Sequence, residues 1–205
     1  MSVYMIENPE AYFRERVPRS DPLLRDMEAA AREDGIPIIG PLMGQLLCLL
    51  VRATGAKRIL ELGTATGYSA LWLARGCAET GGEVVTLEHS PGLAKRALSN
   101  FRKSGLGRHI TLVEGKASDT MADMTGPFDF IFMDIDKEYY RAALAPSARL
   151  LRRNGLLVAD NTAFKDSDDF NRAVADHPMW EAVNLFAFLP FHSPEKDGLC
   201  FALRA

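Results

Sequence analysis

Two short polar stretches, each directly after an apolar run, carry residue types that hold divalent cations. Asp134 and Lys137 follow the run FDFIFM, and Asp160 and Asn161 follow the run GLLVA. A buried carboxylate is costly unless a cation pairs with it. If the two runs are neighbouring strands, about 5 Å apart, Asp134, Asp160 and Asn161 converge outside the carboxyl ends of the sheet. The sequence therefore favours a cation shared by these three side chains.

The expected ligands are two carboxylates and one amide, with no His or Cys among them. Hard oxygen ligands of this kind favour Mg²⁺, Mn²⁺ or Ca²⁺ over zinc. The alternative is that Asp160 and Asn161 cap a turn while Asp134 pairs with Lys137. Asp136 is an outer ligand, a side chain that approaches the adenine edge of a nucleoside, or a solvated side chain.

A glycine-containing turn follows the first apolar run of strand length, in ELGTATGYSALWLA. Gly63 and Gly67 flank this turn, where small residues let a ligand approach the backbone and the next helix offers free N–H groups. Glu88 ends the second strand, where an acid can accept hydrogen bonds from both hydroxyls of a ribose. The spacing GxxxG lacks phosphate-binding features and suits a nucleoside without a pyrophosphate, such as S-adenosylmethionine. A structural turn with a solvated Glu88 is the alternative.

The elements that position these residues alternate between strands and helices. Such alternation predicts βαβ units and a parallel sheet covered on both faces. We expect one domain over residues 1–205, with a helical N-terminal extension over 1–55. Strands are predicted at 58–62, 83–87, 109–113, 128–133, 155–159, 180–189 and 199–205. Helices are predicted at 20–35, 41–53, 67–79, 90–104, 118–124, 138–152 and 167–176.

Composition narrows the class of protein. The chain has 205 residues, of which 47% are hydrophobic and 25% charged, as in ordinary globular proteins. A net charge of −3 does not favour non-specific binding of nucleic acid. The three cysteines are far apart and are expected to be reduced core residues. With no signal peptide pattern and no apolar stretch of membrane length, we expect a soluble cytoplasmic protein that does not enter a membrane.

Five stretches, in order, resemble one known family. They are GIPIIGPLMGQLLCLL, RILELGTATGYSALWLA, EHSPGLAKRA, FDFIFMDIDKEYY and GLLVADNTAF. This set is similar to the metal-dependent O-methyltransferases, which include catechol O-methyltransferase, the plant caffeoyl-coenzyme A O-methyltransferases and small bacterial relatives. The resemblance implies a Rossmann-like, doubly wound α/β fold with a mostly parallel sheet ordered 3-2-1-4-5-7-6, whose last strand is antiparallel.

The resemblance also implies roles for individual residues. Asp134, Asp160 and Asn161 match the metal ligands, and Lys137 matches the catalytic base, working beside Asp134. The positions that match S-adenosylmethionine contacts are Glu61, Gly63, Ser69, Glu88 and Ala117. Further candidates for contact with this cofactor are Met43, Thr64, Gly67, His89 and Asp134.

The implied reaction is methyl transfer to a small hydroxylated aromatic acceptor. A divalent ion, Mg²⁺ or in its place Mn²⁺ or Ca²⁺, would hold two vicinal oxygens and lower the pKa of the hydroxyl, and Lys137 would take the proton. A homodimer is also implied. Rival functions are a tRNA 5-hydroxyuridine methyltransferase and a catalytically idle S-adenosylmethionine-binding protein. An NAD-dependent dehydrogenase is a further rival, but it would have no use for Asp134, Asp160 and Asn161.

Two segments depart from the family and leave the acceptor open. The loop after Asn161 is trimmed, and the segment LPFHSPEKDGL before the last strand is longer than usual. We expect a more open acceptor site for this reason. His192, within the longer segment, has no metal-like spacing and is expected to be structural. The basic cluster Arg14, Arg16 and Arg19 is either a solvated face or a contact for an acidic substrate.

Overall fold

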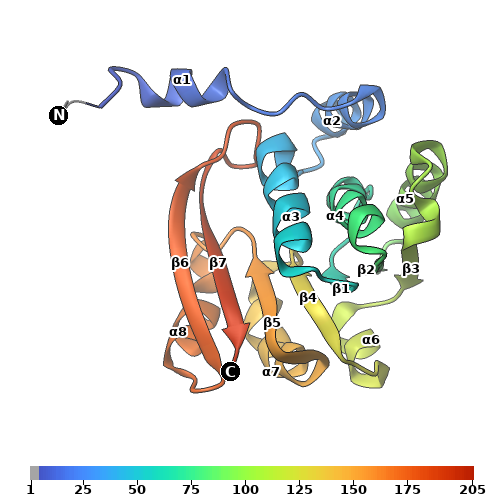
Figure 1. Cartoon of the computed structure of the whole chain (residues 1–205), viewed down its shortest axis with the longest axis vertical. Coiled ribbons are helices and arrows are strands. Elements are labelled where there is room, and N and C mark those ends of the chain that lie inside the picture. Colours follow the sequence, from blue (N-terminus) through green and yellow to red (C-terminus); the bar gives the residue numbers. More distant parts are fainter. Residues whose placement is uncertain (1–4) are drawn as a thin grey trace.

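The computed structural model describes residues 5–205, and its seven strands form one sheet ordered β3-β2-β1-β4-β5-β7-β6 (Figure 1). The strands are β1 (Arg58–Leu62), β2 (Glu83–Glu88), β3 (Ile110–Glu114), β4 (Phe128–Met133), β5 (Leu151–Ala159), β6 (Trp180–Phe188) and β7 (Lys196–Arg204). Strands β1 to β5 pair in parallel, whereas β7 runs antiparallel to both β5 and β6. The order and the antiparallel last strand that the resemblance implied are confirmed.

Helices connect the parallel strands and precede the first of them. They are α1 (Pro9–Arg14), α2 (Pro22–Asp34), α3 (Gly40–Thr54), α4 (Tyr68–Thr80), α5 (Pro91–Ser104), α6 (Ala117–Asp123), α7 (Tyr140–Leu150) and α8 (Asp168–Asp176). Three short 3₁₀ turns lie at Gly107–His109, Lys137–Tyr139 and Lys165–Ser167. Within residues 5–205, no helix is long and apolar enough to cross a membrane.

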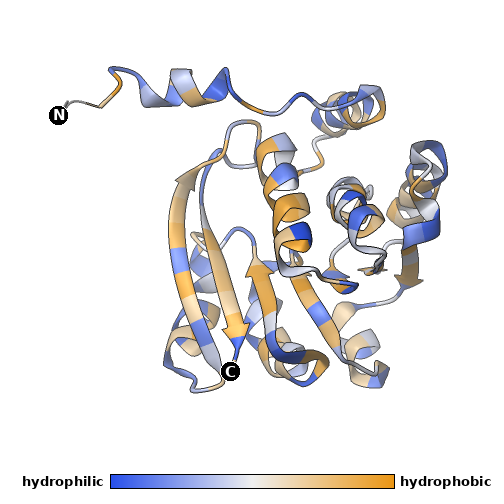
Figure 2. Cartoon of the chain, viewed as in Figure 1, coloured by the Kyte–Doolittle hydropathy of each residue, from blue (hydrophilic) through white to orange (hydrophobic). Residues whose placement is uncertain are grey.

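Two hydrophobic cores lie on opposite faces of the sheet. Side chains of α2 to α5 pack with alternate residues of the strands on one face, and side chains of α6 to α8 do so on the other. Because both faces are covered, the central strands are apolar along most of their length, as the orange of β4 and β5 shows (Figure 2). All three cysteines are buried and free, as predicted.

Local sequence explains most helix boundaries. Asp21 caps α2 by accepting a hydrogen bond from the backbone of Leu24, and Pro22 occupies the first turn. Gly35 and Gly55 end α2 and α3 in the left-handed region, with φ of 65° and 64°. Helix α1 was not predicted from the sequence; it lies beside the β6–β7 connection, where Arg14 pairs with Glu195 and Glu10 pairs with Lys196 (Figure 1).

Candidate functional site

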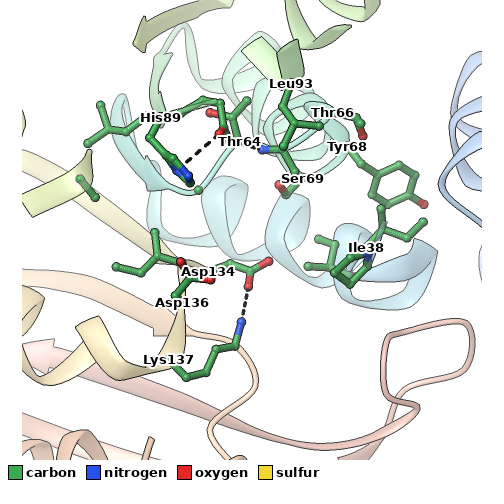
Figure 3. Close-up of a pocket in the computed structure, with 18 of the residues that line it drawn as sticks. Ile38, Thr64, Thr66, Tyr68, Ser69, His89, Leu93, Asp134, Asp136 and Lys137 are labelled. Atoms are coloured by element: carbon green, nitrogen blue, oxygen red, sulfur yellow. Dashed lines mark hydrogen bonds and ion pairs between the residues drawn. The ribbon is translucent and has the colours of Figure 1, made fainter. Parts of the chain in front are cut away.

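The site lies outside the carboxyl ends of β1, β2 and β4, where the order of strands changes direction. Strand β1 pairs with β2 on one side and β4 on the other, so the loops after them diverge and leave a crevice. A cavity of about 230 Å³ fills this place. Eight of the predicted site residues line it (Figure 3): Gly63, Thr64, Ser69, Glu88, His89, Ala117, Asp134 and Lys137.

The glycine turn after β1 is fixed by close packing. Gly63 has φ of 96°, and a Cβ atom there would lie 2.0 Å from the carbonyl oxygen of Asp134. Gly67 has φ of 87°, and its Cβ would lie 2.4 Å from the ring of Phe101. Only glycine fits either position. Gly63 borders the cavity, whereas Gly67 faces α5 and acts by letting α4 begin close to it.

Glu88 is held as an acceptor at the wall of the cavity. Its two carboxylate oxygens accept hydrogen bonds from the backbone N–H groups of Ala65 and Ser90, both at 2.8 Å. These bonds fix the carboxylate at the end of β2, where a ribose binds in nucleotide-binding sheets. His89 follows with an exposed ring whose Nδ1 lies 3.6 Å from Glu88 Oε1.

Glu61 lies buried beneath the cavity rather than on its wall. Its Oε2 accepts a hydrogen bond from Thr86 Oγ1 at 2.5 Å, while Oε1 has no hydrogen-bond partner among residues 5–205. Burial raises the pKa of this carboxyl to about 8 against the effect of hydrogen bonds from Ser69 and Thr86. A buried oxygen without a partner fits a cationic ligand group, such as the ammonium of an amino acid.

The raised pKa of Glu61 predicts a pH dependence of stability. Because the folded state holds this proton up to about pH 8 and the unfolded state loses it near its ordinary pKa of 4.5, the free energy of unfolding falls as pH rises between these values. A tenfold difference in proton affinity between the two states corresponds to about 1.4 kcal/mol. In urea unfolding of the ligand-free protein at pH 5, 6.5 and 8, Glu61→Gln should have a shallower decline than the unsubstituted protein. Parallel declines would show that Glu61 does not titrate in this window.

Asp134 and Asp160 continue β4 and β5 and lie at adjacent strand ends. The backbone N–H of Asp134 donates to Leu62 O at 2.9 Å, and that of Asp160 donates to Met133 O at 3.0 Å. The Tyr140 hydroxyl contacts the carbonyl oxygens of Met133 and Asp160 and ties the two ends together. This role of Tyr140 was not predicted.

The charges of the two acids act on one another. Burial and then the negative charge of Asp160 raise the pKa of Asp134, whereas Lys137 opposes the shift. Lys137 Nζ lies 3.1 Å from Asp134 Oδ1 (Figure 3). The ion pair that the sequence left open as an alternative therefore forms, but it engages only one of the two oxygens of Asp134.

Asn161 is held with its amide nitrogen turned toward the protein. Its backbone has φ of 49°, an unusual value that residues other than glycine adopt at a cost in free energy. Its Nδ2 donates to Asp197 Oδ2 at 2.6 Å. The amide oxygen is thus left as the atom that can meet a cation, while Asp197 fixes the orientation.

His192 contacts Asp160 and is the main site residue that the sequence analysis missed. Its Nε2 lies 2.8 Å and 3.0 Å from the two carboxylate oxygens, and its side chain is 1% exposed. Although burial lowers the pKa of this ring, the hydrogen bond and charge of Asp160 raise it overall. His192 lies in the long β6–β7 connection, and that unusual length was the one signal in the sequence.

The donor set fits a divalent cation. Asp134 and Asp160 repel one another, and a cation between them would relieve the repulsion. Residues 5–205 contain no preassembled group of three or more His, Cys, Asp or Glu side chains with metal-binding geometry. The third oxygen ligand here would come from the amide of Asn161, and asparagine is not one of these four residue types.

Met43, like Glu61 and Gly67, does not line the cavity. It is fully buried in the core between α3 and the sheet. Trp72 and Trp180 are also buried in packing positions, as expected.

A second cavity of about 530 Å³ lies beside the first, between α2 and the β6–β7 connection. Ile38 borders both cavities, and His192 borders the second. The wall of the second cavity carries four arginines: Arg14, Arg19, Arg25 and Arg32. Within residues 5–205, Arg14 forms an ion pair with Glu195 at 2.6 Å, whereas the other three form none.

The matching family model and the similar proteins are all described as O-methyltransferases. Residues 21–185 match the model of a family described as O-methyltransferase. A catechol O-methyltransferase of Mycobacterium tuberculosis is 37% identical over 190 residues, covering 85% of this chain and 86% of that protein. One from Niastella koreensis is 36% identical over 167 residues, covering 78% and 75%.

Solved structures show the same fold. The O-methyltransferase from Bacillus cereus in complex with SAH has a TM-score of 0.85 and 30% identity, covering 96% of each chain. TomG from Streptomyces achromogenes, an O-methyltransferase of tomaymycin synthesis in complex with SAM, has a TM-score of 0.85 and 27% identity. The alignment with TomG covers 98% of this chain and 100% of that one.

Proposed function

The chain belongs to the O-methyltransferase family, and from this premise we propose that it methylates one hydroxyl of a vicinal dihydroxy aromatic small molecule, using S-adenosylmethionine and a divalent metal ion. It is a methyltransferase that depends on S-adenosylmethionine. The dependence on a metal and the identity of the acceptor are the proposed parts. The observation that carries them is the meeting of Asp134, Asp160 and Asn161 at adjacent strand ends, beside the cavity bordered by the glycine turn and Glu88.

We assign the smaller cavity to S-adenosylmethionine, which supplies a methyl group on a sulfonium when bound. Glu88 would accept hydrogen bonds from its ribose, and Gly63 lets the nucleoside approach the backbone. The buried Glu61 would meet its amino group through the oxygen that lacks a partner among residues 5–205. This assignment agrees with the SAH and SAM found in two of the similar structures.

The chemistry of the acceptor side follows from the strand-end residues. Asp134, Asp160 and Asn161 would hold Mg²⁺ or a similar ion, which supplies Lewis acidity that lowers the pKa of a hydroxyl. Lys137 lies at the same corner, with Nζ 3.1 Å from Asp134 Oδ1, and is assigned to take the hydroxyl proton. The rigid strand ends fix nucleophile and methyl donor relative to one another, which supplies much of the acceleration.

An acceptor screen tests this function. Full-length protein is incubated with Mg²⁺, S-adenosylmethionine labelled on its methyl group, and one acceptor at a time: catechols, caffeoyl thioesters, flavonoids or bulk tRNA. We expect label in vicinal diols and none in the matching monohydroxy compounds. Methyl transfer to tRNA alone would favour the tRNA methyltransferase alternative. Absence of transfer to any of these acceptors would favour a catalytically idle S-adenosylmethionine-binding protein.

The arginine-lined cavity is the proposed acceptor entrance, and it favours acceptors that carry a carboxylate. Arg25 and Arg32 lie two turns apart on α2 and border the cavity without an ion pair among residues 5–205. Exposed ion pairs contribute up to about 1 kcal/mol each. The double variant Arg25→Gln/Arg32→Gln should therefore raise the KM for a benzoate with vicinal hydroxyls roughly threefold to tenfold.

Matched measurements separate the loss of the two arginine charges from a general loss of structure. The KM for unsubstituted catechol should not change in the double variant. Arg172→Gln, an exposed change on α8, should alter neither value. An equal rise for both acceptors would contradict a role in binding the carboxylate.

A further inference from the structure

Glu28 is an acid on the wall of the second cavity, and the function proposed above does not use it. It lies on α2 and borders the space of about 530 Å³ that is the proposed acceptor entrance. Arg25 and Arg32 border the same space, three positions before Glu28 and four positions after it. This wall therefore carries charges of both signs.

The hydrogen bonds of Glu28 turn its carboxylate away from these arginines. A Glu and an Arg four positions apart on a helix commonly form an ion pair. Among residues 5–205, Glu28 forms none; its Oε1 accepts hydrogen bonds from the Tyr68 hydroxyl, at 2.7 Å, and from the Ser20 hydroxyl. Burial and then the bond to Glu28 raise the pKa of Tyr68, so this hydroxyl keeps its proton and donates. Two fixed donors thus hold the acid apart from Arg25 and Arg32.

The other oxygen of Glu28 is open to a ligand. Within residues 5–205, Oε2 has no hydrogen-bond donor, and the half-buried side chain borders the cavity. A carboxylate oxygen that is partly withdrawn from water favours a cationic donor such as an ammonium group. The guanidinium groups of Arg25 and Arg32 favour a carboxylate. Opposite charges that share one cavity without pairing match a ligand that carries both an ammonium and a carboxylate.

The cavity is placed to receive the side chain of an acceptor whose ring reaches the strand ends. His192 borders the cavity, and its Nε2 lies 2.8 Å from Asp160 Oδ2. Ile38 borders both this cavity and the one assigned to the cofactor. An aromatic ring with its hydroxyls at the strand ends can therefore extend its remaining substituent toward α2.

We propose that Glu28 binds the ammonium group of the acceptor while Arg25 and Arg32 bind its carboxylate. The preferred acceptor is then a catechol whose side chain ends in an α-amino acid group. This inference rests on the proposed function and specifies its substrate class. Glu28 acts as a specificity residue and takes no part in the transfer of the methyl group.

Three acceptors that differ only in the side chain test the proposal. Each has a ring with vicinal hydroxyls; the side chain ends in an α-amino acid, in the same acid without the amino group, or in the same amine without the carboxylate. At saturating S-adenosylmethionine and Mg²⁺, the unsubstituted full-length protein should have its highest kcat/KM for the amino acid. Glu28→Gln should raise the KM for both amino-bearing acceptors roughly threefold to tenfold, and should not raise it for the acceptor that has only a carboxylate.

The matched control is Glu33→Gln, which removes the same charge from an exposed position on α2 outside the cavity wall. It should leave all three KM values unchanged. Equal kcat/KM of the unsubstituted protein for the acids with and without the amino group would overturn the inference, whether or not a variant folds. An equal rise in all three KM values in Glu28→Gln would overturn it as well, and both results would leave the proposed function intact. Absence of methyl transfer to these three acceptors and to unsubstituted catechol would instead overturn the proposed function.

Discussion

Replacing Asp160 with Asn is expected to reduce methyl transfer to a catechol by more than roughly 100-fold, which is the upper cost of losing an outer-shell partner of a metal. The change keeps the shape of the side chain and removes the charge that faces Asp134. Since Asp160 does not border the cofactor cavity, the affinity for S-adenosylmethionine should change little. Rates at saturating Mg²⁺ and titration calorimetry with the cofactor measure the two effects.

A matched control for this change is Asp166→Asn, which alters an exposed acid in the turn Lys165–Ser167 in the same way. It should leave both the rate and the cofactor affinity unchanged. Normal turnover of Asp160→Asn in the presence of EDTA would show that the strand-end acids do not act through a metal.

Replacing Lys137 with Met is expected to lower kcat by about 10²- to 10⁴-fold, the usual contribution of a positioned general base. The metal should still bind, because Lys137 supplies no metal ligand. Lys137→Arg separates the two possible roles of the side chain. Arginine keeps the charge beside Asp134 but stays protonated, so a general base predicts that it is as slow as Met.

The control for the lysine is Lys95→Met, an exposed position on α5. Steady-state rates at several acceptor concentrations separate kcat from KM. Activity of Lys137→Arg close to that of the unsubstituted protein would show that Lys137 acts only through its charge.

The sheet could be predicted because its strands are short apolar runs bounded by clear breaks. Strands β1 and β4 and the second half of β5 have this pattern, and the polar residues directly after them mark the edge where ligands bind. Placing Asp134 next to Asp160 needed only the order of the strands. The resemblance supplied that order, and the structure has it.

The contacts of the site could not be read from local sequence. His192 meets Asp160 across 32 positions, and the link depends on how the β6–β7 connection folds back. Which oxygen of Glu61 lacks a hydrogen-bond partner among residues 5–205 depends likewise on Thr86, which lies on another strand. Hydrophobic periodicity reports which face is buried but carries no information on which buried polar atoms find partners.

The implied homodimer stays a prediction. Edge strand β6 exposes apolar side chains, with Phe186 72% exposed and Val183 51% exposed. Exposed apolar surface on an edge strand is typical of a place where another chain packs. Sedimentation of the purified protein at several concentrations would measure the assembly.

The role of the strand-end acids is tested most directly by removing the metal and restoring it. Purified protein is stripped with EDTA, dialysed, and assayed for methyl transfer to a catechol while Mg²⁺ or Mn²⁺ is added back. We predict negligible transfer in the stripped protein and full recovery with one ion bound per chain. Undiminished transfer in the presence of EDTA would contradict the account.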